Sequence, residues 1–319
     1  MNLHVPNASA SAPGSALLAI SGGRDSVALL HMLVSAGLKR LVLCHFNHGL
    51  RGRESGQDAA FVRRLAVHYG LPCEVEKADV ITWAAKRKVS LETAARTLRY
   101  DFLHRMAAKH AAARIYLAHH ADDQAETILA NLCRGTGIGG LKGMVMETNS
   151  TPALCRPLLN KTRAEIADYV QKHGLSFRED SSNTSPQHRR NRLRHEVLPL
   201  LNAVYAREVS PLIVRLGKQA ERDDDCLQQQ ALALIQEEGL ITQEGRLRVT
   251  AKLRSQHPAV LSRVLYFWLG EVLGLPGLDS ESLEAASSLL LPGGVAKMNL
   301  PEGRHLRRKA GYLWVTEPT

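Results

Sequence analysis

The residues with the clearest capacity for chemistry form the hexapeptide SGGRDS, residues 21–26. Its two glycines let a ligand approach the backbone, and the amides of such a loop and of a helix start form an anion site. Ser21 and Ser26 can add hydroxyl donors, whereas Asp25 would repel a phosphate unless a divalent cation lay between them. The loop therefore predicts phosphate binding, with Asp25 as a Mg²⁺ contact or as a residue that holds the loop. A turn that merely caps the next helix is the alternative.

A second polar group follows a strand predicted over residues 114–118. On the next helix, apolar residues are expected to face the core, which leaves the acids on the polar side near its start. Acids there complement the helix dipole, but the dipole does not call for histidines. Imidazoles and carboxylates at a strand end indicate a divalent metal or nucleotide site, and Mg²⁺ carried on ATP fits better than a protein-caged zinc. The polar residues are His119, His120, Asp122, Asp123 and Glu126, and the residues expected in the core are Ala125, Ile128, Leu129 and Leu132.

Two arginines lie one turn apart on a helix predicted over residues 90–112. Arg96 follows Glu92 by four residues, and such a pair is sufficient to explain it as a surface residue. Arg99 has no acid three or four residues before it, so we expect it to reach a phosphate or the charge of a transition state. The apolar stripe expected to bury this helix comprises Leu91, Ala95, Leu98, Phe102 and Met106.

Two loops complete the candidate residues. Residues 45–55 begin at the end of a predicted strand, where His45, Asn47, His48 and Arg51 are either ligand-side groups or parts of a solvated connection. Residues 135–143 are rich in glycine and are expected to be too flexible for a core element. This second loop either closes over a ligand or is a mobile surface loop.

The elements that must position these residues alternate along the first 200 positions. Strands are predicted at residues 16–20, 40–46, 72–77 and 114–118, with helices between them. This alternation predicts an α/β fold, a doubly wound parallel sheet with its ligands at the carboxyl ends of the strands.

The remaining chain predicts a smaller helical and α+β domain. We expect one or two helices over residues 206–238 with an exposed turn at 222–225, short strands at 246–249 and 295–300, and an apolar helix at 260–273. The predicted organisation is therefore a flexible N-terminus over residues 1–14, a catalytic domain over 15–200 and an RNA-binding domain over 201–319.

Composition points to an anionic partner. The chain of 319 residues carries a formal net charge of +10, which favours a nucleic acid over a membrane because the basic residues fall in clusters. Five scattered cysteines without CxxC spacing argue against zinc, iron–sulfur and disulfide frameworks. With no signal peptide pattern and no long apolar run, we expect a cytoplasmic protein with no membrane partner.

Basic residues concentrate in two places. The first cluster, within residues 189–194, holds more positive charge than a solvated helix face needs, so it predicts contacts with RNA phosphates. Residues 304–309 form a second cluster, for which protection of an edge strand is the alternative. The four arginines of the first cluster are Arg189, Arg190, Arg192 and Arg194.

Taken together and in order, the motifs resemble those of the tRNA(Ile)-lysidine synthases, members of the PP-loop ATP pyrophosphatase superfamily. The resemblance is strong to about residue 200 and looser beyond, and the chain looks like the shorter form of that family. The motifs are SGGRDS at 21–26, HFNHGLRGRES at 45–55, LETAARTLRY at 91–100, AHHADDQAET at 118–127, RGTGIGGLKGM at 134–144, RPLL at 156–159 and RNRLRHEVLP at 190–199.

The resemblance implies a reaction and roles for the residues. ATP with Mg²⁺ would adenylate the C2 oxygen of cytidine 34 in the CAU anticodon of tRNA(Ile), and the side-chain amine of free L-lysine would then displace AMP. Arg99 would serve adenylation, and Asp123 or Glu126 would pair with the lysine ammonium or accept its proton. The residues implied to hold ATP are Ser21, Gly22, Gly23, Arg24, Asp25, Ser26 and His119, with Asp25 at the Mg²⁺.

The resemblance leaves room for a homodimer. Two other functions stay open at this point: a different PP-loop tRNA-modifying enzyme of the thiolase type, and a catalytically silent RNA-binding protein. A thiolase with a cluster or persulfide mechanism would need well-placed cysteines, and the sequence has no CxxC pair.

Overall fold

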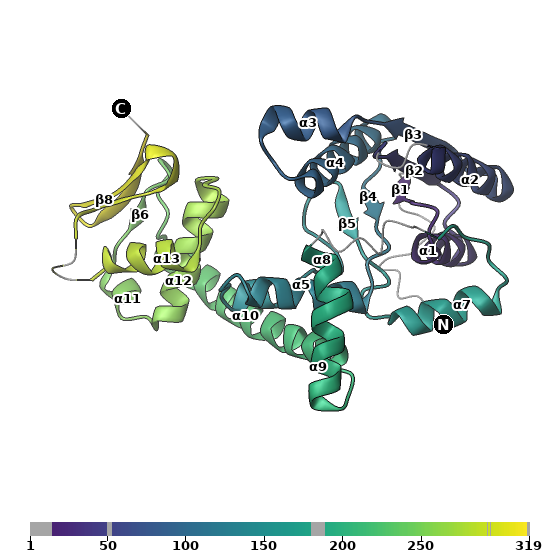
Figure 1. Ribbon diagram of the computed structural model, residues 1–319. Helices are drawn as coiled ribbons and strands as arrows, with labels where there is room; N and C mark the ends of the chain where they lie inside the picture. The colour runs from purple at the N-terminus through teal and green to yellow at the C-terminus, as the bar shows by residue number, and fades with distance from the viewer. Residues whose placement is uncertain (1–14, 50–52, 180–188, 292, 294, 318–319) are drawn as a thin grey trace. The chain divides into compact units, whose positions relative to one another are not determined.

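The computed structural model describes residues 15–49, 53–179, 189–291, 293 and 295–317 (Figure 1). The N-terminus expected to be flexible and the candidate Arg51 therefore lie outside the described residues, as does the side chain of Arg189. Contacts divide the chain into two compact units, residues 1–130 with 143–214, and residues 131–142 with 215–319. The functional boundary expected at residue 200 stays a prediction.

The first unit is built on a parallel sheet of five strands in the order β3-β2-β1-β4-β5. Leu18 of the central strand β1 is paired with Leu43 on one side and with Tyr116 on the other. The predicted parallel sheet is confirmed, and the structure adds β5, which the sequence pattern did not indicate. The strands are β1 Ala16–Ala19, β2 Leu41–Asn47, β3 Cys73–Lys77, β4 Arg114–Tyr116 and β5 Ala153–Cys155.

Helices cover both faces of this sheet. Leu18 packs with residues of α1 (Arg24–Ser35), α2 (Arg53–Tyr69) and α7 (Arg163–Lys172), whereas its neighbour Leu17 packs with α4 (Leu91–Lys109) on the opposite face. Burial on both faces explains why all seven residues of β2 are buried. The unit also contains α3 Val80–Arg87, α5 Ala121–Leu132, which begins in it, and the consecutive helical segments α8 Arg189–Arg192, η2 Leu193–Val197 and α9 Leu198–Tyr205.

Two predicted helix faces are wrong in detail. Leu91, expected to be buried, is 42% exposed, and α4 instead buries Ala94, Phe102, Leu103 and Ala107. On α5, Leu132 is 54% exposed. Spacings of three and four residues fit more than one adjacent stripe of a helix, so packing against the sheet selects the face that is buried. Helix α7 opens with a capping box, formed by Thr162 and Glu165.

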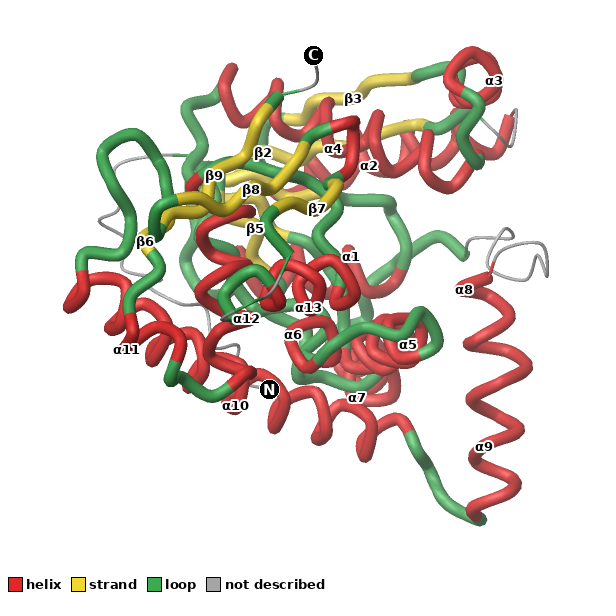
Figure 2. Tube along the Cα trace, turned by 90° about the vertical axis from the view of Figure 1, so that its left-hand side faces the viewer, coloured by secondary structure: helices red, strands yellow, loops and turns green. Residues whose placement is uncertain are grey.

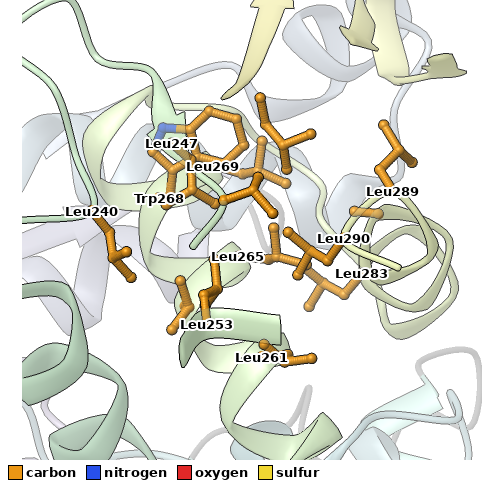
Figure 3. Packing of buried hydrophobic residues seen from close by; sticks show 14 of the residues in the cluster. Leu240, Leu247, Leu253, Leu261, Leu265, Trp268, Leu269, Leu283, Leu289 and Leu290 are labelled. Carbon is orange, nitrogen blue, oxygen red and sulfur yellow. The ribbon is translucent and has the colours of Figure 1, made fainter. Parts of the chain in front are cut away.

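The second unit consists of helices and a four-stranded antiparallel sheet in the order β6-β9-β8-β7 (Figure 2). Trp268, fully buried among leucines, lies at the centre of its core (Figure 3), and its indole Nε1 donates a hydrogen bond of 2.7 Å to the Gly245 carbonyl. The elements are α6 Ile138–Leu141, α10 Ser210–Glu238, β6 Leu247–Arg248, α11 Ala251–Arg254, α12 Pro258–Tyr266, η3 Phe267–Val272, α13 Ser280–Ser288, β7 Lys297–Asn299, η4 Pro301–Gly303, β8 His305–Lys309 and β9 Tyr312–Thr316.

One prediction for this unit is corrected. Residues 222–225 lie within the continuous helix α10, and Asp224 is 5% exposed because it forms ion pairs with Lys142 and Arg263. The glycine-rich segment contains the short helix α6, in which the Asn131 amide donates a hydrogen bond of 2.7 Å to the Gly140 carbonyl. The ion pairs of Asp224 therefore explain why a charged residue that was expected in an exposed turn is buried.

Within the described ranges, no single helix is both long and apolar enough to cross a bilayer. The consecutive helices 190–205 and 210–238, which meet at a sharp bend, reach that length and composition only when taken together.

Candidate active site

A cavity of about 710 Å³ lies at the carboxyl ends of β1, β2 and β4, the edge at which the sequence predicted ligands. Its walls come from the SGGRDS loop, the end of β2, and the segment that joins β4 to α5. Arg99, Phe177, Arg178, Arg194 and His195 complete the lining from other elements. Segments far apart in sequence thus meet at one edge of the sheet.

The SGGRDS loop joins β1 to α1 and is held by its own hydroxyl groups. The Ser26 hydroxyl donates to the Gly23 carbonyl at 2.8 Å, and the Gly23 amide donates to the Ser21 hydroxyl oxygen at 3.1 Å. Gly22 has a φ of +91°, and a Cβ there would lie 3.2 Å from the Phe61 ring. The positive φ favours glycine, and the close ring adds to the cost of a larger residue.

Helix α1 starts at this loop without a side-chain cap. Its N-cap is Gly23, which has no side chain to accept a hydrogen bond from the first turn. The simple capping alternative is therefore not favoured, because the amide groups of a helix start that no side chain caps are donors for an anion.

His120 links the loop to α5. Its side chain is 2% exposed, and its Nε2 lies 3.6 Å from Asp25 Oδ2 and 3.5 Å from Asp123 Oδ2, while Nδ1 lies 3.4 Å from Asp122 Oδ2. Burial works against a charged ring, but the hydrogen bond to Asp122 and the charges of Asp123 and Asp25 raise the pKa of His120 overall. The three carboxylates around the ring thus favour its charged form. Sequence analysis included His120 in its motif but assigned it no role of its own.

Arg99 and His119 line the cavity with unpartnered polar atoms. Within the described part of the chain, Arg99 Nε and His119 Nδ1 are both buried without a hydrogen-bond partner. Burial lowers the pKa of His119 to about 3, and the nearby charge of Arg99 adds to the effect. The ring is therefore neutral at pH 7. Arg96, as expected, is exposed, and its guanidinium stacks on Tyr100 with 4.8 Å from Cζ to the ring centroid.

The position predicted for Glu126 is wrong. It was expected on the polar side of its helix, but it is 1% exposed and does not line the cavity. Arg190 Nε lies 2.9 Å from Glu126 Oε2, and Arg194 Nε lies 2.5 Å from Oε1. Two guanidinium groups therefore cover the buried carboxylate, which is why it can be removed from water.

Asp123 takes part in the same cluster. Arg194 Nη2 lies 3.0 Å from Asp123 Oδ1, and Arg190 Nη2 lies 3.5 Å from the same atom. Burial raises the pKa of Asp123, but the charges of His120 and Arg190 lower it below the ordinary value overall. Asp123, unlike Glu126, lines the cavity.

The predicted RNA-binding arginines thus differ in their surroundings. Arg190 and Arg194, four residues apart, share one helix face and contact acids of the site. Arg192 points elsewhere and pairs with Glu196 at 2.9 Å, with both side chains exposed. Contact of these arginines with RNA stays a prediction.

Two further residues of the site, Arg178, which the sequence did not single out, and His45, which it did, contact the strand end and the SGGRDS loop. The Arg178 amide donates to the Gly22 carbonyl at 2.9 Å, and its guanidinium lies 2.8 Å from Asp58. Among the residues of the predicted loop 45–55, His45 donates through Nδ1 to the Ile20 carbonyl at 2.9 Å. These contacts brace the SGGRDS loop from the second strand and from a segment more than 150 residues away along the chain.

Comparison with known proteins fits this geometry. The model of the PP-loop domain family matches residues 4–201. The chain belongs to the PP-loop family. The PP-loop of this chain, residues 21–26, follows the central strand β1 and lines the cavity.

Curated relatives carry one name. A tRNA(Ile)-lysidine synthase of Porphyromonas gingivalis is 46% identical over 185 residues, which cover 58% of this chain and 40% of the relative. Those of Deinococcus radiodurans and Clostridioides difficile are 40% and 32% identical over 93% and 94% of this chain, and cover 47% and 66% of the relatives. The chain thus spans about half the length of the curated relatives it matches.

Among solved structures, the U34-tRNA thiolase NcsA of Methanococcus maripaludis has a TM-score of 0.51 and 18% identity, with 65% of this chain and 73% of that chain covered. At this identity the likeness concerns the fold alone. It agrees with a PP-loop fold for the first unit.

The PP-loop site also has the donors that ATP and Mg²⁺ need. Uncapped amides and hydroxyls at the PP-loop suit phosphates, and Arg99, whose buried Nε has no hydrogen-bond partner among the described residues, adds a cation. Among the described residues, no group of three or more His, Cys, Asp or Glu is arranged to hold a metal. Mg²⁺ is commonly bound by one or two carboxylates together with substrate phosphates, and Asp25 and Asp123, both beside His120, fit that requirement.

Proposed function

We propose that this chain joins L-lysine to C2 of cytidine 34 in the CAU anticodon of tRNA(Ile), through an adenylated cytidine, with release of pyrophosphate and AMP. The observation that carries the proposal is the meeting of the PP-loop, Arg99, His119 and Asp123 in one cavity. The names of the curated relatives support the same reaction. A tRNA-modifying enzyme would work in the cytoplasm, and a homodimer stays a prediction.

The residues divide the adenylation step between them. Amides and hydroxyls of the PP-loop would bind phosphate oxygens and orient the α-phosphorus toward the cytidine oxygen. Asp25, with Asp123, would hold Mg²⁺, which supplies charge neutralisation on the phosphates. Arg99, which is desolvated and whose Nε has no hydrogen-bond partner among the described residues, would stabilise the negative charge that develops as pyrophosphate leaves. The neutral His119 can accept or donate a hydrogen bond without adding charge.

The acids of α5 suit the lysine step. Asp123 lines the cavity and its pKa is lowered, so in the second step it can pair as a carboxylate with the substrate ammonium. Glu126 is covered by Arg190 and Arg194 and would act by holding the arginines and Asp123 in place. Displacement is favourable because adenylation converts a poor leaving oxygen into AMP.

The thiolase alternative is not favoured. All five cysteines are free, and Cys44, the cysteine that lines the cavity, is buried. Burial raises the pKa of its thiol to about 12, so little thiolate is present at pH 7.

The test compares Asp25→Asn with the matched control Asp101→Asn, an exposed acid of α4. Each protein is incubated with a tRNA(Ile) transcript, ATP and labelled lysine, and pyrophosphate and nucleoside masses are measured. We expect pyrophosphate release to fall by at least about 100-fold in Asp25→Asn and to stay unchanged in Asp101→Asn. Undiminished release from Asp25→Asn, or production of ADP where AMP is expected, would contradict the proposal.

A further inference from the structure

The sheet of the second unit has one face that its hydrophobic core does not use. Leu306 of β8 and Leu313 of β9 are fully buried in that core. Because successive side chains of a strand point to opposite faces, their neighbours lie on the other side of the sheet. We call this side the outer sheet face; it presents Lys297, Arg307, Lys309, Tyr312 and Trp314.

Positive charges lie side by side on the outer sheet face. Lys297 of β7 is directly opposite Arg307 of β8 in the antiparallel register, and both are exposed, as is Lys309. Like charges in directly opposed positions destabilise a sheet. Among the described residues, none of the three forms an ion pair or hydrogen bond that would offset this repulsion. An anionic partner would remove that cost.

Two neighbouring arginines, unlike Arg307, have partners within the protein. Arg304 pairs with Glu302 at 2.8 Å and with Glu317 at 3.1 Å. Arg308 turns toward the core side and donates to the carbonyls of Leu289 and Leu291 at the end of α13. Arg304 and Arg308 of the basic cluster 304–309 therefore bind partners within the protein, whereas the side chains of Arg307 and Lys309 form no ion pair or hydrogen bond among the described residues.

Protection of a sheet edge does not explain the pattern. The strand order places β7 at an edge, which accounts for Lys297, but β8 lies between β9 and β7 (Figure 2). The edge-strand alternative raised for residues 304–309 is therefore wrong for Arg307, which is paired with a strand on each side, whereas Lys309 lies beyond the last residue pair between β7 and β8.

Aromatic rings stand between these cations. Trp314 is the cross-strand partner of Arg307, and Tyr312 is the partner of Lys309. Arg246 Cζ lies 5.9 Å from the centroid of the Trp314 ring, so a second guanidinium flanks the aromatic side chain. Rings among cations on an open sheet are the means by which proteins stack bases and bind the phosphates between them.

We propose that the outer sheet face binds a single-stranded segment of RNA, with a base stacked on Trp314 and phosphates on Lys297, Arg307 and Lys309. An anionic membrane is a poorer fit, because the two rings lie half-buried in the sheet instead of projecting from it. The inference rests on the proposed function in that it names a surface of this chain for the RNA substrate.

The test is RNA binding by the full chain, measured by fluorescence anisotropy with a labelled tRNA(Ile) transcript and a 12-nucleotide single strand. The triple variant Lys297→Gln, Arg307→Gln and Lys309→Gln is compared with a control of equal charge, Lys218→Gln, Lys252→Gln and Arg254→Gln, whose residues are also exposed. We expect at least about tenfold weaker binding of both RNAs by the first variant and a log–log salt slope smaller by about 2. Circular dichroism melting verifies that each variant is folded.

Trp314 provides a second, charge-independent readout. Trp314→Leu should weaken binding of the single strand about tenfold, and Trp314→Tyr, which keeps an aromatic face, should restore it to within about threefold of the parent chain. Equal loss in the leucine and tyrosine variants would overturn the stacking role.

The remaining outcomes separate the two proposals. Unchanged RNA affinity and salt slope in the triple variant, or loss of binding only to phosphatidylserine vesicles, would overturn the inference and leave the proposed function intact. A parent chain whose RNA binding depends on the outer sheet face but which forms no lysidine would refute the proposed function alone.

Discussion

The cluster that joins Glu126 to Arg190 and Arg194 leads to a quantitative prediction. The carboxylate is 1% exposed, whereas the side chains of Arg190 and Arg194 are 35% and 19% exposed. Glu126→Gln keeps the shape of the side chain but removes its charge. Both guanidinium groups then lose their strongest acceptor, and the helical segment 189–205 loses an anchor to α5.

The expected magnitude follows from these contacts. A hydrogen bond to a charged group contributes about 1.5–3 kcal/mol, and the deletion of one partner of a buried pair costs about 3–5 kcal/mol. Arg190 and Arg194 are partly solvated and Arg194 keeps Asp123, so we expect the lower end, about 2–3 kcal/mol. When the free energy of local opening of residues 189–205 falls by this amount, the rate of amide exchange in the segment rises roughly 30- to 150-fold.

The assay is hydrogen–deuterium exchange with peptide-level mass readout of residues 193–205. The control is Glu196→Gln, which removes the exposed partner of Arg192 from the same segment and should change exchange by no more than about threefold. Exchange in Glu126→Gln that is no faster than in Glu196→Gln would refute the assigned role of the buried cluster.

Two further predictions concern buried charge. Asp224→Ala should lower the free energy of unfolding by about 3 kcal/mol, because Lys142 and Arg263 lose their carboxylate partner. The control Asp223→Ala removes an exposed neighbouring acid and should change the free energy of unfolding by no more than about 0.5 kcal/mol. Urea denaturation followed by tryptophan fluorescence measures both values. His119 has a pKa of about 3 in the folded chain and an ordinary pKa of 6.5, so between these pH values the unfolded chain binds more protons than the folded chain. The stability that comes from burying the neutral ring is therefore lost as the pH falls from 6.5 toward 3. Its imidazole Cε1–H resonance should show no titration between pH 5 and 8, and a midpoint near 6.5 in an NMR titration would contradict the desolvated ring.

Local signals predicted the PP-loop well because its determinants are close together in sequence. The apolar run of β1, the paired glycines and the start of α1 follow one another within 20 residues. The Ser90 cap of α4 and the capping box of α7 are equally local, because donor and acceptor lie three residues apart. Such features depend on neighbours that the sequence itself displays.

The partners of charged residues could not be predicted in the same way. Glu126 was assigned to a polar helix face, because its spacing says nothing about Arg190 and Arg194 more than 60 residues away. Asp224 was placed in an exposed turn, although Lys142 and Arg263 allow it to be buried. In both cases the burial of a carboxylate depends on cations supplied by distant segments.

For this protein, the sequence by itself determined the alternation of β1 to β4 with helices, the phosphate-binding turn and the family, because each rests on short-range spacing and residue type. Tertiary structure alone decided which helix faces are buried, which arginines cover acids and which stay free on the outer sheet face. The physical reason is that the charge state and exposure of a side chain depend on desolvation and on partners brought close in space, and neither is encoded by neighbours along the chain.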